Sequence, residues 1–142
     1  GAADGVEEGQ PVLGVEGLIG QIVLVDENNS RALLITDSAH ALPVQVNRSG
    51  LRAIAEGSGD IDRLVIRHLA ATADIRAGDL LVTSGLGGRF PHGYPAARVT
   101  NVEIAAGDAF AVVSAAPASA LDRGRHVLVV AQSSQFEAAA AP

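Results

Sequence analysis

The stretch GDLLVTSGLGGRFPHGYP, from Gly78 to Pro95, joins a short apolar run to a loop that is rich in glycine and proline. It holds five glycines, two prolines and the only tyrosine of the chain. The run DLLVT has the length and composition of a β-strand. The glycines permit a tight path after it, and the prolines stiffen that path. Three interpretations are open: a phosphate-binding loop, a serine nucleophile turn, or a shaped structural loop.

The spacing within the stretch argues against the first two interpretations. A dinucleotide-binding loop needs G-x-G-x-x-G leading into a helix, whereas the glycines here are followed by Arg89, Phe90 and a proline. A Walker loop needs a lysine, and all ten basic residues of the chain are arginine. A serine-hydrolase elbow places glycine two residues before and after the serine, but Ser84 has Val82 and Leu86 there.

One catalytic alternative stays open, because chymotrypsin-like proteases are also built from β-barrels. His40, Asp62 and Ser84 follow one another in the His…Asp…Ser order of those enzymes. Ser84 lacks the GDSGG context, however, and the segments between the three residues are short. The four histidines show no metal-binding spacing, so we expect each to be a surface or turn residue; they are His40, His68, His92 and His126. We therefore predict no catalytic, cofactor or metal site.

The loop is therefore interpreted as a shaped structural loop that carries large apolar side chains. These side chains either fold back and plug the end of a barrel or face a partner protein. We expect Phe90 to be the plug and Tyr94 to be exposed, because its hydroxyl is easily hydrated. Arg89 and His92 flank Phe90 and should be exposed. The candidate partner-binding residues are Leu86, Arg89, Phe90, His92 and Tyr94.

Around this stretch, the whole chain repeats short apolar runs separated by turn residues such as DENNS, GSGD and DRGR. Helical periodicity is nearly absent, so the pattern predicts an all-β sandwich or barrel. In ARVTNVEI the alternation changes phase, which predicts a bulge near Thr100–Asn101. The expected strands are Gln10–Leu13, Leu18–Val25, Arg31–Thr36, Leu42–Val46, Leu51–Ala55, Leu64–Leu69, Asp79–Thr83, Ala97–Ile104, Phe110–Ala115 and His126–Val130.

Composition narrows the class of protein further. The chain of 142 residues is long enough for one domain or two very small ones, and its formal net charge of -6 disfavours nucleic-acid binding. Cysteine is absent, which excludes disulfides and thiol catalysis. The longest apolar run, Pro11–Val25, is interrupted by Glu16 and glycines and is too short to span a membrane as a helix. The opening GAADGVEEGQ suggests a piece cut from a longer protein.

Four blocks of sequence, in order, resemble the rod shape-determining protein MreC family. They are GQPVLGVEGLIGQIVLV, SRALLITDSAHALPVQVNRSGLRAIAEGSG, ADIRAGDLLVTSGLGGRFPHGYPAARVTNV and LDRGRHVLVV. The resemblance extends from about Asp4 to Val130, and the block from Gly78 to Pro95 is the most distinctive. It implies an all-β fold of two small six-stranded β-barrels packed side by side, the first truncated at its N-terminus. Residues 1–47 would belong to the first barrel, residues 48–132 to the second, and residues 133–142 to a disordered tail.

The same resemblance implies a function. MreC-like proteins are non-enzymatic scaffolds of the peptidoglycan-synthesising machinery that elongates rod-shaped bacteria. They are anchored in the inner membrane by a segment absent from this chain, and their barrels lie in the periplasm. The implied partners are penicillin-binding protein 2, MreD, MreB, RodA and further copies of the same protein, with no cofactor and no nucleic acid.

Overall fold

The computed structural model describes residues 2, 5–86, 90–104, 107, 109–121 and 128–129. Within those residues the chain forms ten β-strands and no α-helix, so the all-β prediction is confirmed. Each expected strand is present, with ends shifted by at most a few residues, except that the ends of the expected strand His126–Val130 lie outside the described residues. The strands are β1 (Pro11–Leu13), β2 (Leu18–Val25), β3 (Ser30–Leu34), β4 (Ala41–Val46), β5 (Arg52–Gly57), β6 (Leu64–Ala70), β7 (Leu80–Thr83), β8 (Pro95–Ile104), β9 (Phe110–Pro117) and β10 (Leu128–Val129).

Six of these strands close into an antiparallel barrel in the order β4-β5-β6-β9-β8-β7. Its core is aliphatic, as the composition requires, with Leu42, Val44 and Val46 of β4 all pointing inward. Alternate residues of β9 behave in the same way, since Val113 and Ala115 are buried while the residues between them are more exposed. The alternation seen in the sequence is therefore the alternation between the barrel interior and solvent.

The remaining strands form a second, open sheet in the order β10-β1-β2-β3. The expected fold was two six-stranded barrels, the first of them truncated at its N-terminus. The described part of the chain contains one closed six-stranded barrel and, beside it, an open sheet. The sheet has its own small apolar cluster of Val12, Ile19 and Ile22. Three strands and a two-residue β10 present too few pairs to close a barrel.

The division between the two units also differs from the expected boundary after residue 47. Strand β4 pairs with both β5 and β7, so residues 41–46 belong to the closed barrel. At the other end, β10 pairs with β1 and therefore belongs to the open sheet. Residues 133–142 of the expected tail lie outside the described residues.

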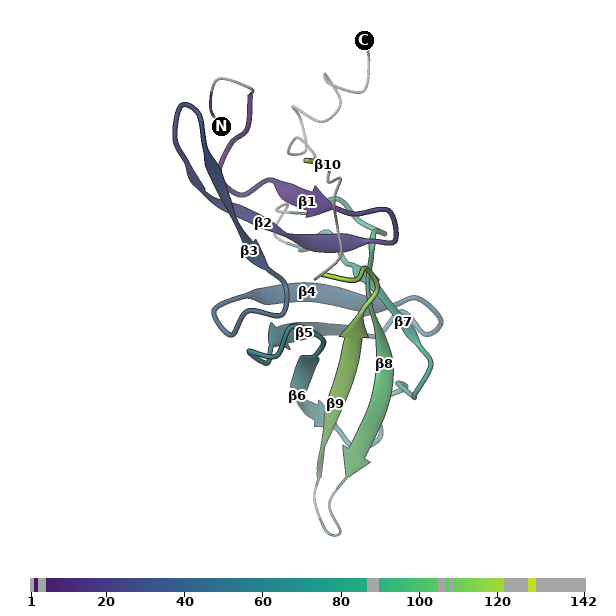
Figure 1. Cartoon of the computed structure of the whole chain (residues 1–142). Coiled ribbons are helices and arrows are strands. Elements are labelled where there is room, and N and C mark those ends of the chain that lie inside the picture. Colours follow the sequence, from purple (N-terminus) through teal and green to yellow (C-terminus); the bar gives the residue numbers. More distant parts are fainter. Residues whose placement is uncertain are drawn as a thin grey trace.

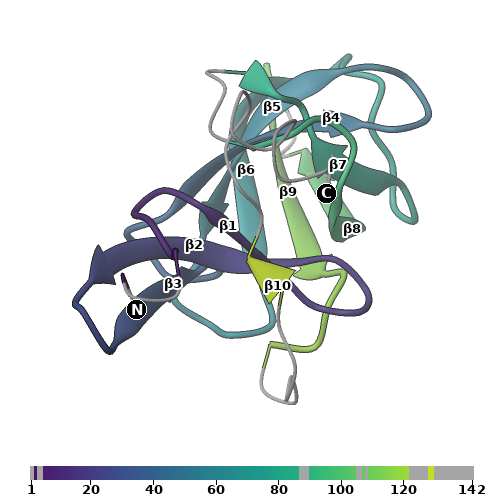
Figure 2. The same ribbon diagram turned by 90° about the horizontal axis from the view of Figure 1, so that it is seen from above.

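The open sheet lies across one end of the barrel, beside β4 (Figures 1 and 2). Leu18 of β2 and Ile35, just after β3, are fully buried and belong to the barrel core. Gly17 packs so closely against the Pro95 carbonyl that a side chain at that position would collide with it. The two units therefore share apolar packing and direct backbone contact.

The other end of the barrel carries the far ends of β8 and β9 (Figure 1). The predicted bulge is confirmed, because the register of β8 on β9 shifts between Val99 and Asn101. At another register shift, in β6, His68 has a φ of 62°, which residues other than glycine rarely adopt. The ring of His68 lies edge-on to Phe110 at a centroid distance of 6.4 Å.

Candidate partner-binding loop

The loop between β7 and β8 is fixed at its base by Thr83, the last residue of β7. The Thr83 hydroxyl donates to the Pro91 carbonyl at 2.5 Å and accepts from the Tyr94 amide at 2.9 Å. The backbone of Thr83 adds a hydrogen bond from its amide to the Tyr94 carbonyl and accepts one from Gly93. Thr83 is fully buried, so these bonds are shielded from water. The only sign of this role in the sequence is the position of a threonine at a strand end.

Phe90 folds back from this loop into the barrel core, where only 4% of its surface is exposed. Its ring meets the His40 ring edge-on, with centroids 6.2 Å apart and planes at 72°. The expected burial of Phe90 is therefore observed. Phe90 is not an accessible anchor for a partner, and it acts on the loop surface only by holding the loop in place.

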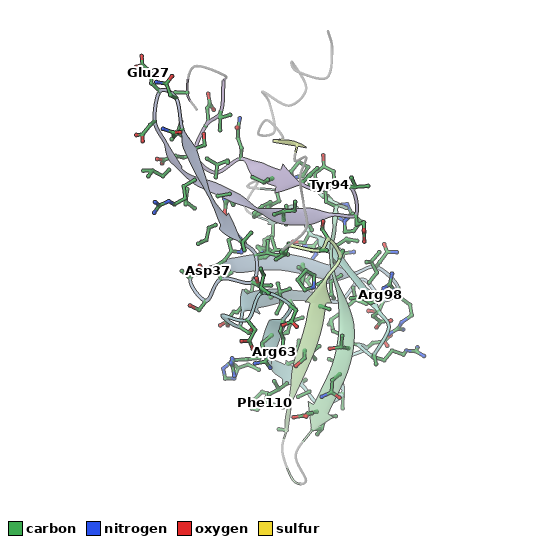
Figure 3. All side chains as sticks on the ribbon, in the orientation of Figure 1. Glu27, Asp37, Arg63, Tyr94, Arg98 and Phe110 are labelled. Atoms are coloured by element: carbon green, nitrogen blue, oxygen red, sulfur yellow. The ribbon has the colours of Figure 1, made fainter. Side chains whose placement is uncertain are left out.

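The other candidate residues differ in accessibility. Leu86 is 56% exposed and His92 is exposed, whereas Tyr94 is half-buried, which corrects the expectation that Tyr94 is exposed. Arg89 lies outside the described residues. Figure 3 places Tyr94 beside the end of the open sheet, far from Phe110 at the opposite end of the barrel. The candidate surface is thus next to the junction of the two units.

The His40, Asp62 and Ser84 arrangement of a protease is not assembled. Nε2 of His40 faces Oε1 of Gln21 at 3.2 Å, and no described group is bonded to Nδ1. The Ser84 hydroxyl accepts a hydrogen bond from the amide of Leu86, as in a local serine turn. Asp62 lines a surface cleft with Pro117 and Ser119. Neither ring nitrogen of His40 is hydrogen-bonded to Ser84, so the pair of base and nucleophile that such a protease needs is not formed.

His40 also corrects the expectation that each histidine is a surface or turn residue. Its ring is buried, and burial lowers its pKa from the ordinary value of 6.5, while nearby Asp37 has a smaller raising effect. His68 and His92 are exposed as expected, and His126 lies outside the described residues. The described residues contain no cluster of three or more His, Cys, Asp or Glu that could hold a metal ion.

An ion-pair network, which the sequence analysis did not identify, braces the strand before the loop. Arg48 donates from Nε and Nη2 to the two carboxylate oxygens of Asp79, both at 2.9 Å, and from Nη2 to Asp74 at 2.8 Å. Asp79 also accepts from the amide of Arg76 and so caps the turn before β7. The hydrogen bonds from Arg48 lower the pKa of both carboxyl groups. The network joins the turn after β4 to the turn before β7.

This geometry defines a small all-β domain in which the described residues do not assemble the His–Asp–Ser arrangement of a protease. The family described as "Rod shape-determining protein MreC, barrel core" matches residues 1–131. The chain belongs to the MreC family. It spans only about a third of the length of the curated relatives that it matches: 35% of the Escherichia coli K12 protein and 37% of the Haemophilus influenzae Rd protein.

Those two relatives, both named cell shape-determining protein MreC, are 51% and 50% identical to the chain over 130 residues, 92% of its length. Among solved structures, MreC from Pseudomonas aeruginosa is 56% identical, with a TM-score of 0.88 over 92% of this chain and 84% of that one. A Helicobacter pylori complex of MreC with penicillin-binding protein 2 has a TM-score of 0.66 over 87% of this chain and 79% of that one, at 24% identity.

Another similar structure is described as the major periplasmic domain of the cell shape-determining filament MreC. It has a TM-score of 0.67 at 25% identity and covers 84% of this chain and 74% of that one. In the part of this chain that the structure describes, no helix has the length and hydrophobicity needed to cross a membrane.

Proposed function

We propose that this domain is a non-catalytic scaffold of the peptidoglycan-synthesising machinery that determines rod shape. The observation that carries the proposal is the MreC family match over residues 1–131. The Helicobacter pylori homologue in complex with penicillin-binding protein 2 supports a transpeptidase as the partner. The domain would act on the periplasmic side of the inner membrane, and its anchor would lie in a part of the protein not included in this chain.

We further propose self-association and an assembly with MreD, MreB and RodA, as the family resemblance implies. The open sheet β10-β1-β2-β3 would be part of a second barrel that the rest of the longer protein completes. Support comes from its two outer strands, β3 and β10, each of which pairs with only one neighbour in the described residues. Unpaired strand edges favour pairing with another segment or chain.

The surface we propose for the transpeptidase is made by the accessible candidate residues of the β7–β8 loop. Large apolar side chains on an exposed loop are a frequent feature of binding surfaces. Leu86 is its most exposed large apolar residue in the described part, and the same loop carries the exposed His92 and the half-buried Tyr94. Arg89 remains a candidate by its position in the sequence, and Phe90 would contribute by holding the loop.

The test is a binding titration of the full chain with the periplasmic part of penicillin-binding protein 2 from the same organism. Leu86→Asp should weaken association by at least tenfold, because it removes an apolar contact with the partner. The melting temperature should not change, because Leu86 is exposed in the chain alone. Ile54→Asp is the matched control, since Ile54 is a comparably exposed aliphatic residue on β5, outside this loop. Full binding by Leu86→Asp would disprove the proposed surface. No binding of the folded wild type at high micromolar concentration would contradict the transpeptidase as partner.

A further inference from the structure

The junction between the open sheet and the barrel contains a buried histidine. His40 directly precedes β4, and its surface is only 4% exposed. Its backbone belongs to the barrel side, because its carbonyl accepts from the Gly57 amide of β5 at 3.0 Å. Its side chain reaches the other unit, because Nε2 lies 3.2 Å from Oε1 of Gln21 on β2. One side chain therefore bridges the two units.

The hydrogen bonds around this bridge fix the position of the ring proton. Nε2 of Gln21 donates to the Gly9 carbonyl at 3.2 Å, which leaves Oε1 of Gln21 facing His40 as an acceptor. An acceptor requires a donor, so Nε2 of His40 carries the hydrogen and Nδ1 holds a lone pair in the neutral ring. Among the described residues, no group is bonded to Nδ1, which is fully buried.

The surroundings of the ring do not favour a positive charge. Gln21 approaches from β2 and Phe90 from the β7–β8 loop, and neither is charged. Asp37, in the turn before β4, is the charged group that acts on His40 among the described residues, and its carboxylate already accepts from the amide of Ala39. A second proton on the ring would place an N–H at Nδ1 with no described acceptor, in an apolar environment.

We propose that His40 makes the junction between the two units sensitive to acid. The neutral ring joins the open sheet to the barrel, and protonation at Nδ1 favours a state in which the sheet has separated and the ring is hydrated. A periplasmic location, which rests on the proposed function, would expose this junction to the external pH. The acid response itself depends only on the chemistry of His40 and not on that location.

The direction of the effect follows from the burial of the ring. Burial lowers the pKa of His40 in the joined state below the ordinary value of 6.5, which the separated state recovers. Well above that value both states are neutral, so the junction has its full stability. As the pH falls below 6.5, the separated state binds the proton first and is favoured over the joined state. The loss of junction stability is complete below the lowered pKa of the joined state.

The test is hydrogen exchange of the full chain between about pH 7.5 and about pH 5, with protection factors corrected for the intrinsic pH dependence. Protection in β2 should fall by up to about tenfold per pH unit in acid, while protection in β9 stays constant. His40→Gln keeps a donor for Gln21 and does not titrate, so it should abolish the acid response. His68→Gln and His92→Gln, at exposed histidines, should keep it.

A measurement on the wild type keeps the proposal testable if His40→Gln does not fold. Nitrogen-15 NMR of the imidazole rings should show His40 as the Nε2–H tautomer, with a titration midpoint below the ordinary value of 6.5. A midpoint of His40 at or above that value would overturn the proposal. So would β2 protection in the wild type that does not change with pH.

Discussion

Thr83 and Phe90 stabilise the β7–β8 loop by different means. Thr83 satisfies backbone groups at the base of the loop, and Phe90 fills the core beneath it. Burying an aromatic ring contributes through its area, whereas a buried hydroxyl contributes because its absence leaves polar groups unpaired. The two residues therefore differ in the substitutions that they tolerate.

Replacing Phe90 with alanine should reduce the free energy of unfolding by about 3–5 kcal/mol, since it leaves a cavity in the barrel core. Urea denaturation followed by circular dichroism measures the change. The matched control is Phe110→Ala, because Phe110 is 57% exposed, and its loss should cost no more than about 0.5 kcal/mol. Equal effects of the two substitutions would show that Phe90 does not fill the core.

Replacing Thr83 with valine keeps the shape of the side chain but removes the hydroxyl. The Pro91 carbonyl and the Tyr94 amide each lose this partner, so we expect a loss of about 1–3 kcal/mol by thermal or urea denaturation. Thr100→Val is the control, because the Thr100 hydroxyl bonds the Ser114 carbonyl at an exposed site. A Thr83→Val variant as stable as the wild type would mean that water replaces the hydroxyl at the loop base.

At the scale of elements, Arg48 and Asp79 hold together the ends of two paired strands. Arg48 follows β4 and Asp79 precedes β7, and these strands are neighbours in the barrel. The Asp79 carboxylate is nearly buried and accepts from both Arg48 and Arg76. A carboxylate with this number of donors is stabilised in its charged form.

This arrangement predicts a second loss of stability in acid, at lower pH than the loss that involves His40. The pKa of Asp79 in the folded state lies below its ordinary value of 3.8, mainly because Arg48 donates to it. Its contribution to stability is present above that value and is lost as the pH falls through the lowered pKa. Asp79→Asn should cost about 1–3 kcal/mol at neutral pH and should flatten the loss of stability below about pH 4.

The measurement is the urea midpoint of the wild type, Asp79→Asn and Asp60→Asn, taken from neutral pH to below about pH 4. Asp60→Asn serves as the control, since Asp60 is exposed and lies 3.8 Å from Arg63 in a weak surface pair. If Asp79→Asn and the wild type lose stability in parallel below about pH 4, Arg48 does not lower the pKa of Asp79.

The existence of the strands could be predicted from the sequence because alternation and turn residues are local signals. Even the bulge after Val99 is visible as a change of phase. The pairing of β10 with β1 could not be predicted in this way, because register between distant segments leaves no local pattern. The same limit applies to the site: the burial of Phe90 was expected from its size, whereas the buried contact of His40 with Gln21 depends on two units meeting.

At the scale of the whole molecule, the two units differ in how completely they are closed. Among the residues that the structure describes, the barrel core contains sixteen buried apolar residues, including Leu18 and Ile35 from the sheet side, whereas the sheet's own cluster contains three. The barrel has no free edge, but the sheet ends in β3 and β10. Local opening should therefore require less free energy in the sheet.

Hydrogen exchange at neutral pH should show this difference directly. We expect the amides of β1 to β3 to be less protected than those of β6, β8 and β9, because the sheet has fewer buried contacts and more exposed hydrogen bonds. Addition of a binding partner that covers a sheet edge should raise protection in β3. Equal protection of both units in the chain alone would mean that the sheet is as stable as the barrel.

The pairing of β10 with β1 has a consequence for the order in which the protein folds. The six barrel strands are consecutive in the chain, so the barrel can form as soon as β9 has been synthesised. The sheet cannot be complete at that point, because β1 must wait for β10 near the end of the chain. Closing so long a loop is slow in an unfolded chain, but a folded barrel brings the two segments close together. The barrel thus serves as the template on which β1 meets β10.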